Sequence, residues 1–348
     1  MYTLLRPHDR ASFAELMDVL LADATVRSAK SLHGSFAKKA VRGRDYWYYQ
    51  FTDIDGGTKQ VYVGPESERV RELIEVAHKK PVNDEHLKAS IAAAIKAGYA
   101  TTPPKQFKII SRLADYGFFA AGGVLAGTHA FIAIGNLLGV RWMDGGSTQD
   151  VDFAHAGKHI AIALPSNIRV DLFDAIESLE MGFVPLSAFN GKQGGSYINP
   201  ETKEERIDFL TPLTSLSTEP VFIKEIGIAL QPLKFMELSL GKVGRSAILS
   251  STGNGAVAIN VPDPALFAVH KLIVAAERGS ANPKSTKDVM QAAAIISFYL
   301  DNDSKAIMEA WRETLARGAG WKKRMNEGLG RMAALYPDLH KRFVASTK

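Results

Sequence analysis

Apolar residues recur at helical spacing near the start of the chain, and strand-forming residues follow directly. The helical spacing spans 9–29, where one face carries Phe13, Leu16, Met17, Leu20 and Leu21. Strand formers then dominate 32–64, from the aromatic run 46–51 through the turn 55–57 to 60–63. The pattern predicts an amphipathic helix followed by a small β-meander.

Two further helices are expected before the middle of the chain. They span 67–80 and 83–98, and the second begins at Asn83, a good N-cap residue. The sequence Thr101-Thr102-Pro103-Pro104 then favours a break in regular structure. We therefore expect an N-terminal module made of residues 1–100.

Strand-like and helical stretches alternate through the middle, and helical spacing dominates the end. The expected middle elements are helices at 105–116, 129–138 and 168–181 and strands at 118–126, 148–153, 159–164, 196–198, 206–210, 221–230, 233–240, 246–250 and 256–260. Helices are expected at 263–278, 284–300, 303–316 and 320–335. This predicts an α/β (α+β) fold, in which a mixed-sheet core at 105–260 lies between the N-terminal helix and meander module and a C-terminal helical domain at 261–348.

The composition is that of a soluble globular protein. Of 348 residues, 46% are hydrophobic and 23% charged, and no apolar run reaches the roughly 18 residues of a membrane span. The N-terminus lacks the basic-then-apolar order of a signal peptide. Because the chain has no cysteine, thiol catalysis and thiolate metal sites are excluded. We expect a cytoplasmic protein with no membrane partner.

Positive charge concentrates at the C-terminal end. The net charge is +5, and residues 303–348 alone reach that value, with ten Lys or Arg minus five Asp or Glu. Local basicity attracts polyanions such as RNA. A solvated helical surface is the simpler interpretation on composition alone.

Two aspartates one residue apart, Asp150 and Asp152, carry the strongest chemical signal. On a strand both side chains point to one face, where two carboxylates repel unless a cation lies between them. Oxygen ligands of this kind suit Mg²⁺, which also binds substrate phosphates. The Gly127-Thr128 step, where an apolar run should give way to a helix, is a candidate phosphate cradle. Together the two motifs suggest metal-assisted phosphoryl chemistry.

A third acid, Asp208, lies on a later apolar strand and is expected to join Asp150 and Asp152. Three convergent carboxylates hold two metal ions, one activating an attacking hydroxyl and the other orienting a triphosphate. Other interpretations stay open, because Asp150 and Asp152 also suit a polar strand end. Arg206 also offers an ion-pair partner for a nearby acid.

Several other enzyme classes are disfavoured. The chain has no Walker Gly-x-x-x-x-Gly-Lys-Ser/Thr run, no Gly-x-Gly-x-x-Gly after a strand, no His-Glu-x-x-His and no Gly-x-Ser-x-Gly. His155 and His159 are four residues apart, as in some metal pairs. Exposed or hydrogen-bonded histidines in a strand connection are the simpler interpretation.

The order of these motifs resembles a known family. An apolar strand, Gly127-Thr128, the Asp150-x-Asp152 pair and the single Asp208 are similar to the nucleotidyltransferase fold of DNA polymerase β type. Within that superfamily, residues 105–300 resemble bacterial nucleotidyltransferases related to the AbiEii and MenT type toxins. One departure is the Gly-Thr step, where many relatives carry Gly-Gly or Gly-Ser.

The resemblance implies Mg²⁺-dependent transfer of a nucleoside monophosphate from an NTP to an acceptor hydroxyl, with release of pyrophosphate. The toxin-like proteins also have a basic helical motif with a Lys-Asp pair after the core. The implied residues are Asp150, Asp152 and Asp208 for metal and catalysis, and Gly127, Thr128, Lys271, Lys287 and Asp288 for the nucleotide. From the residues alone, a lysine such as Lys271 equally well extends along an apolar helix to solvent.

The acceptor is not defined by these motifs. By analogy with the toxins we expect RNA, such as the end of a tRNA, and an antitoxin or a second copy of the chain is a candidate partner. The alternative function is a non-catalytic nucleotide- or nucleic-acid-binding protein on the same fold. Such a protein would bind an NTP without releasing pyrophosphate.

The aromatic meander raises a separate question. Its aromatic run 46–51 lies near the cations Lys38, Lys39, Arg42 and Arg44, and such residues stack bases and neutralise phosphates. A small core with a dry interface is the simpler interpretation. Strand alternation predicts that Trp47 and Tyr49 are buried on one face, while Tyr46, Tyr48 and Gln50 are displayed on the other.

Overall fold

The fold is mixed α/β, which confirms the predicted class. A computed structural model describes residues 1–347 except 31–33, 42, 53–57, 69, 72–73, 76–83, 145, 147, 158–169, 188–192, 203–204, 225 and 280. Among these residues, no helix has the length and apolar character needed to cross a membrane.

The N-terminal helices pack on strands from much later in the chain. The predicted first helix is α1 (Pro7–Lys30), and Phe13, Leu16 and Leu20 of its apolar face are buried. Together with α3 (Asp84–Ala97) it shares a buried cluster with β14 (Val243–Ser250). That strand pairs with β15 (Ala256–Pro262) and with β5 (Thr101–Thr102). The break expected at 101–104 therefore lies inside a packed unit.

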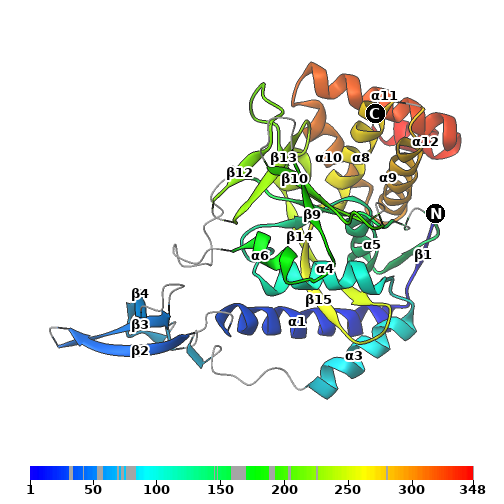
Figure 1. Cartoon of the computed structure of the whole chain (residues 1–348). Helices are drawn as coiled ribbons and strands as arrows, with labels where there is room; N and C mark the ends of the chain where they lie inside the picture. The colour runs from blue at the N-terminus through cyan, green and yellow to red at the C-terminus, as the bar shows by residue number, and fades with distance from the viewer. Residues whose placement is uncertain are drawn as a thin grey trace.

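The predicted meander is present as three antiparallel strands. They are β2 (Gly34–Val41), β3 (Arg44–Thr52) and β4 (Thr58–Pro65). Figure 1 shows them standing apart from the α/β body, beyond the C-terminal end of α1. The expected turn at 55–57 and much of the expected helix at 67–80 lie outside the described residues.

A mixed sheet forms the centre of the body. Its strands are β6 (Val124–Leu125), β8 (Val151–Ala154), β9 (Val184–Ser187), β10 (Gln193–Ile198), β11 (Arg206–Pro212), β12 (Val221–Ile223) and β13 (Ile228–Leu233). The order is β12-β13-β11-β10-β9, and β8 pairs with β11 and β6. The strands expected at 196–198 and 206–210 form the antiparallel hairpin of β10 and β11, whereas β11 runs parallel to β8 and β13. A separate short pair joins β1 (Tyr2–Leu4) to β7 (Val140–Trp142).

Helices surround this sheet and form a bundle at the C-terminal end (Figure 1). Those nearer the sheet are α4 (Pro104–Asp115), α5 (Gly127–Leu138), α6 (Leu172–Glu177) and α7 (Glu237–Gly241). The bundle consists of α8 (Pro264–Arg278), α9 (Pro283–Asn302), α10 (Ser304–Leu315), α11 (Ala319–Leu335) and α12 (Pro337–Ser346). The four predicted C-terminal helices are confirmed. The last helix, α12, was not expected; it starts afresh at a proline, which is well tolerated in a first helical turn.

Two predicted strands are wrong over most of their length. The segment expected as a strand at 118–126 is extended only at β6, because Gly117 and Gly122 take φ angles of 79° and 93° and fold the chain into turns. The strand expected at 233–240 ends at its start, since Phe235 has a φ of 65° and α7 follows. The helix expected at 168–181 is shortened to α6, and the strand expected at 159–164 lies outside the described residues.

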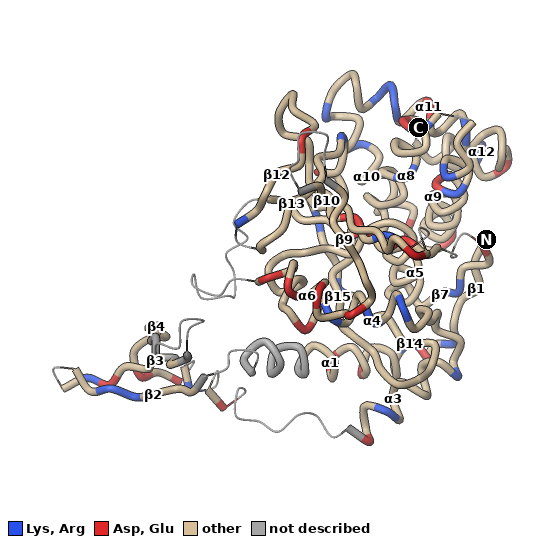
Figure 2. The backbone as a smooth tube through the Cα atoms, viewed as in Figure 1, with Lys and Arg blue, Asp and Glu red and all other residues tan. Residues whose placement is uncertain are grey.

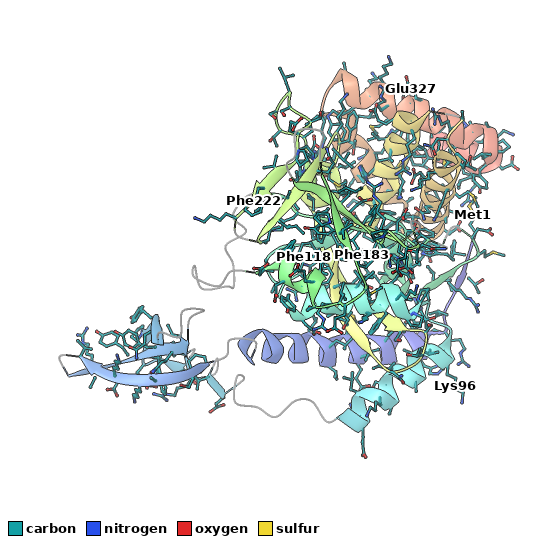
Figure 3. All side chains as sticks on the ribbon, in the orientation of Figure 1. Met1, Lys96, Phe118, Phe183, Phe222 and Glu327 are labelled. Carbon is teal, nitrogen blue, oxygen red and sulfur yellow. The ribbon has the colours of Figure 1, made fainter. Side chains whose placement is uncertain are left out.

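The core explains which face of the sheet carries polar groups. Phe153 of β8 and Phe209 of β11 are fully buried and stack with ring centroids 5.5 Å apart. Phe118 packs edge-on against both rings and, as Figure 3 shows, lies inside the body. Because side chains alternate along a strand, the residues directly before and after Phe153 and Phe209 in the sequence point to the opposite face. Those residues include Asp152 and Asp208.

Candidate active site

Asp152 and Asp208 lie side by side on neighbouring strands. The parallel pairing of β8 with β11 places their Cα atoms directly opposite, with Val151 opposite Ile207 on the buried face. Burial and the negative charge of Asp208 raise the pKa of Asp152 to about 6. The sheet therefore holds two carboxylates in mutual repulsion, as expected for a site that receives a cation.

Gly127 forms the wall against which the Asp152 carboxylate rests. It begins α5 with a φ of 60°, and a β-carbon at this position would collide with Asp152 Oδ2. The backbone N–H of Ala126 donates to the carbonyl of Asp152 at 2.8 Å, which ties the turn to β8. The start of α5 is thereby fixed beside the carboxylate pair. Its first N–H groups form the positive end of a 12-residue helix.

Asp208 is oriented by two neighbours that the β10–β11 hairpin provides. Its Oδ1 accepts hydrogen bonds from Ser196 Oγ at 2.5 Å and Arg206 Nε at 2.7 Å. Arg206 also donates to Ser196 Oγ at 2.9 Å. The arginine that offered an alternative explanation for this acid is thus its direct partner, and the carboxylate is held in one orientation.

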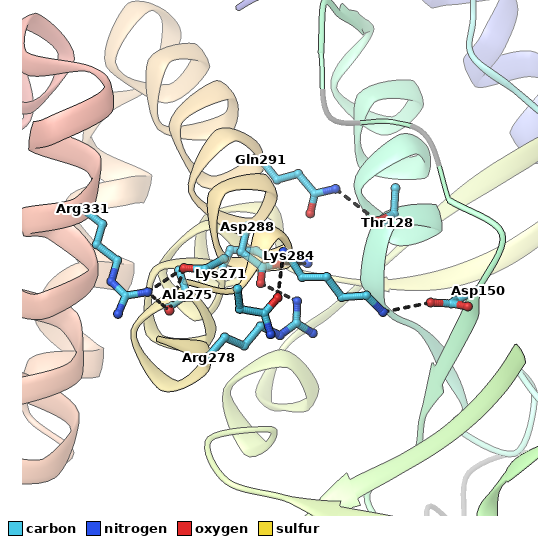
Figure 4. A network of polar contacts seen from close by, with 11 residues as sticks. Thr128, Asp150, Lys271, Ala275, Arg278, Lys284, Asp288, Gln291 and Arg331 are labelled. Atoms are coloured by element: carbon cyan, nitrogen blue, oxygen red, sulfur yellow. Dashed lines mark hydrogen bonds and ion pairs between the residues drawn. The ribbon is translucent and has the colours of Figure 1, made fainter. Parts of the chain in front are cut away.

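Asp150 takes a different position from the other two acids. It precedes the first residue of β8, and its Oδ2 is 3.1 Å from Lys284 Nζ on α9. Figure 4 shows Lys284 reaching across from α9 to this carboxylate. Both side chains are partly exposed, so the ion pair is open to exchange with another anion or cation.

The start of α9 presents one polar face to the site. Residues 284, 287, 288 and 291 are spaced at i, i+3, i+4 and i+7, so they share that face. Gln291 Nε2 donates to Thr128 Oγ1 at 3.3 Å, which links α9 to the first turn of α5 (Figure 4). Burial and the positive charge of Lys271 on α8 lower the pKa of Lys287.

Lys271 and Asp288 form a buried pair between α8 and α9. Lys271 Nζ is 2.7 Å from Asp288 Oδ1, and Arg278 Nη1 is 2.7 Å from Asp288 Oδ2. The side chains of Lys271 and Asp288 are only 9% and 3% exposed. In this arrangement Asp288 clamps two cations, and the Lys271 ammonium is engaged by it.

His129 follows Thr128 and is almost completely buried. Neither ring nitrogen has a hydrogen-bond partner within the described part of the chain. Burial and Lys287 lower its pKa to about 4, so the ring is neutral at neutral pH. His155, by contrast, is held by backbone groups, with Nε2 2.9 Å from the Ala121 carbonyl oxygen, and His159 lies outside the described residues.

The acidic residues present fit one Mg²⁺ ion better than two. No group of three or more His, Asp or Glu side chains in the described ranges is arranged to hold a metal ion. Mg²⁺ is nevertheless commonly bound by one or two carboxylates, with waters and substrate phosphates completing its octahedron. Asp152 and Asp208 match that donor set, whereas Asp150 is bound to Lys284.

A mixed sheet with paired carboxylates, a glycine turn at a helix start and a polar helix face has the parts that phosphoryl transfer requires. A family model described as Nucleotidyltransferase matches residues 105–316, more than half of the chain. The chain belongs to this nucleotidyltransferase family. No curated protein matches the sequence.

One solved structure is similar to the chain. It is the crystal structure of an antigenic nucleotidyltransferase-like protein from Paracoccidioides brasiliensis, at 13% identity and a TM-score of 0.36. The match covers 71% of this chain and 95% of that one.

Three residues of the site were not predicted from the sequence. On α9, Lys284 lies three residues before Lys287 and Gln291 lies three residues after Asp288, so helical periodicity alone places both on the face of the Lys-Asp pair. Ser196 could also have been predicted, because the register of the hairpin places it directly opposite Asp208. The contact between Lys284 and Asp150 depends on how α9 docks on the sheet, which no local pattern encodes.

Proposed function

We propose that the protein transfers a nucleoside monophosphate from an NTP to an acceptor hydroxyl, with Mg²⁺ bound and pyrophosphate released. One observation carries this proposal: Asp152 and Asp208 are directly opposed on parallel strands, beside a glycine turn that begins a helix. Membership of the nucleotidyltransferase family supports the transfer of a nucleotide.

In this proposal, one set of residues binds the Mg²⁺ ion and another binds the triphosphate. Asp152 and Asp208 would hold Mg²⁺, and Ser196 and Arg206 fix the orientation of Asp208. When bound, the ion would neutralise the triphosphate and align it for attack. Gly127 lets the backbone approach the phosphates closely, and the N–H groups of the first turn of α5 point toward them.

The polar face of α9 supplies the positive charge on the other side of the nucleotide. Lys284 and Lys287 would contact the phosphates, and Thr128 would exchange its contact with Gln291 for a phosphate oxygen. Lys284 would leave Asp150 when the triphosphate enters, since an exposed ion pair is only weakly stabilising. Only after that exchange would Asp150 be available as the third carboxylate that a second Mg²⁺ needs.

Lys271 and Asp288 have a more remote part in this proposal. Their buried pair, with Arg278, fixes the packing of α8 against α9 and thereby the direction of the polar face. Lys271 still contributes its charge, because it lowers the pKa of Asp152 against the larger effect of burial.

The acceptor we propose is RNA in the cytoplasm. The support is the positive net charge of +5 and its concentration in residues 303–348. A toxin-like role with an antitoxin partner follows only from the resemblance described above.

Labelled nucleotides test the proposal directly. Purified protein is incubated with each α-³²P-labelled NTP, Mg²⁺ and total RNA, and both RNA-bound label and pyrophosphate are measured. We expect incorporation by wild type and by the exposed-acid control Asp338→Asn, and none by Asp152→Asn or with EDTA. If wild type binds NTP but neither labels RNA nor releases pyrophosphate, the non-catalytic alternative replaces the proposal.

A further inference from the structure

The meander presents a face of clustered tyrosines that the site described above does not use. Tyr48 and Tyr62 are directly opposite on β3 and β4, and Tyr46 lies two residues before Tyr48. Directly opposed residues share one face of a sheet. The Tyr62 ring lies 6.0 Å from that of Tyr46 and 5.6 Å from that of Tyr48, centroid to centroid. We call this surface the tyrosine face.

The three rings remain accessible. Tyr62 is 53% exposed, and Tyr46 and Tyr48 are half-buried. The rings meet at interplanar angles of 48° and 66°, so they do not cover one another by parallel stacking. Figure 3 shows the described side chains of β2–β4 as a group separate from those of the body. The expected burial of Trp47 on the other face is not found, since Trp47 is half-buried like Tyr46 and Tyr48, and the side chain of Tyr49 lies outside the described part of the structure.

Positive charge lies on the tyrosine face, and within the described residues it forms no ion pair with an acid. Lys39 is opposite Tyr46, and its Nζ lies 5.2 Å from the centroid of the Tyr48 ring. Its side-chain hydrogen bond goes to Gln60, a neutral residue. Arg44, the first residue of β3, alternates to the same face and is exposed. Figure 2 shows basic positions along β2.

On the opposite face of the meander, basic side chains form ion pairs with acidic ones. Lys38 Nζ is 2.8 Å from Asp45 Oδ2 and 2.9 Å from Glu66 Oε2. Glu66 also accepts hydrogen bonds from Trp47 Nε1 at 2.9 Å and from Arg71 Nε at 2.5 Å. The strands therefore separate their charges, with acids paired to cations on one side and cations among tyrosines on the other.

We propose that the tyrosine face binds single-stranded nucleic acid. Bases stack on accessible aromatic rings, and nearby cations neutralise the phosphates, which accounts for both features of this face. Protein–protein interfaces are depleted in lysine, whereas this face carries the Lys39 ammonium among its accessible rings. If the proposed transfer to RNA is correct, on which this step rests, the meander is the arm that captures the acceptor.

Binding is measured separately from catalysis. Fluorescence anisotropy follows a fluorescein-labelled 12-nucleotide oligo(U) RNA with the full chain, in EDTA and without NTP. We expect single-stranded RNA to bind more tightly than an RNA duplex of the same length, because paired bases cannot stack on the rings. Asp152→Asn should bind as wild type, so a failure of transfer and a failure of binding are distinguishable.

Matched variants assign the binding to this face. Tyr46→Thr, Tyr48→Thr and Tyr62→Thr keep strand propensity but remove the ring, and each should weaken binding roughly tenfold. The corresponding Phe variants should bind nearly as wild type. Lys39→Gln and Arg44→Gln should each reduce the slope of log affinity against log salt by about 0.7. Phe222→Thr, at an exposed aromatic side chain elsewhere, is the control and should change nothing.

Three results would overturn the proposal. One is the absence of RNA binding by wild type at micromolar protein, and another is equal affinity for the single strand and the duplex. The third is unchanged binding by the Tyr46/Tyr48/Tyr62→Thr triple variant. A loss of self-association in the triple variant, with RNA affinity retained, would assign the face to contact with a second copy. Lys39→Glu, at an exposed side chain, tests the same surface if the triple variant misfolds.

Discussion

The carboxylate of Asp152 fills the space that a β-carbon on Gly127 would need. Gly127 also has a φ of 60°, a conformation that costs an L side chain roughly 1–2 kcal/mol. We predict that Gly127→Ala lowers the free energy of unfolding by more than about 2 kcal/mol, because strain and collision add. It should also displace Asp152 from Asp208 and remove nucleotide transfer.

Gly182→Ala separates strain from collision. Gly182 has a φ of 70°, and a β-carbon there would meet no atom within 4 Å. Its substitution should therefore lower unfolding free energy by roughly 1 kcal/mol and leave transfer intact. Urea unfolding and the labelled-NTP assay measure the two effects. Equal loss of activity in both variants would contradict the role assigned to Gly127.

Asp152→Asn should abolish transfer and stabilise the metal-free fold. The pKa of Asp152 is raised from 3.8 to about 6, so the folded state binds this proton more tightly than the unfolded state. The stability from that proton is fully present below about pH 4 and is lost as the pH rises through 6. Above pH 6 the variant should gain on the order of 1–3 kcal/mol over wild type.

Urea unfolding at pH 4, 6 and 8 in EDTA measures the difference in unfolding free energy between Asp152→Asn and wild type, which should increase with pH. Mg²⁺ should raise the melting temperature of wild type at pH 8 and have little effect on Asp152→Asn, because the ion stabilises the folded state through the carboxylate pair. Asp338→Asn is the control at an exposed acid. If Mg²⁺ does not change the melting temperature of wild type, with or without NTP, that result would argue against the cation site.

The short-range parts of this site were readable from the sequence. The sequence predicted Asp152 and Asp208 on strands, and the pairing of the strands expected at 196–198 and 206–210 places Ser196 beside Asp208. Alternation also predicted Asp150 and Asp152 on one face, but β8 begins at Val151, so Asp150 lies outside the strand. The parallel pairing of β8 with β11 joins segments more than 50 residues apart, and the family resemblance rather than any local pattern brought them together. The strand expected at 118–126 failed for a local reason, since an apolar run also suits a buried turn when glycines interrupt it.

Asp288→Asn should strongly destabilise the protein. The variant leaves the buried Lys271 ammonium without a charged partner, and breaking a buried pair from one side typically costs about 3–5 kcal/mol. Because Arg278 is partly exposed, it recovers hydration and limits the loss. Glu313→Gln removes an exposed partner of Arg317 and should cost less than about 1 kcal/mol.

The double variant Lys271→Met/Asp288→Leu distinguishes two roles for this pair, which are fixing α8 against α9 and contacting the nucleotide. If the pair only fixes α8 against α9, the double variant should recover most of the stability lost by Asp288→Asn. It should also retain measurable transfer with a nearly unchanged KM for NTP. A large rise in KM at restored stability would instead place Lys271 on the nucleotide.

His270 should make the protein sensitive to mild acid. Its Nδ1 lies 2.8 Å from Ser239 Oγ, and burial, reinforced by the positive charge of Lys271, lowers its pKa from 6.5 to about 3. The unfolded state therefore binds a proton that the folded state refuses between pH 6.5 and 3, so stability falls as the pH drops through this window. The slope from one such group approaches about 1.4 kcal/mol per pH unit. His270→Gln should reduce the slope measured by urea unfolding between pH 4 and 6.5, whereas His86→Gln, at a half-exposed ring, should not. An unchanged slope in His270→Gln would show that other groups govern acid unfolding.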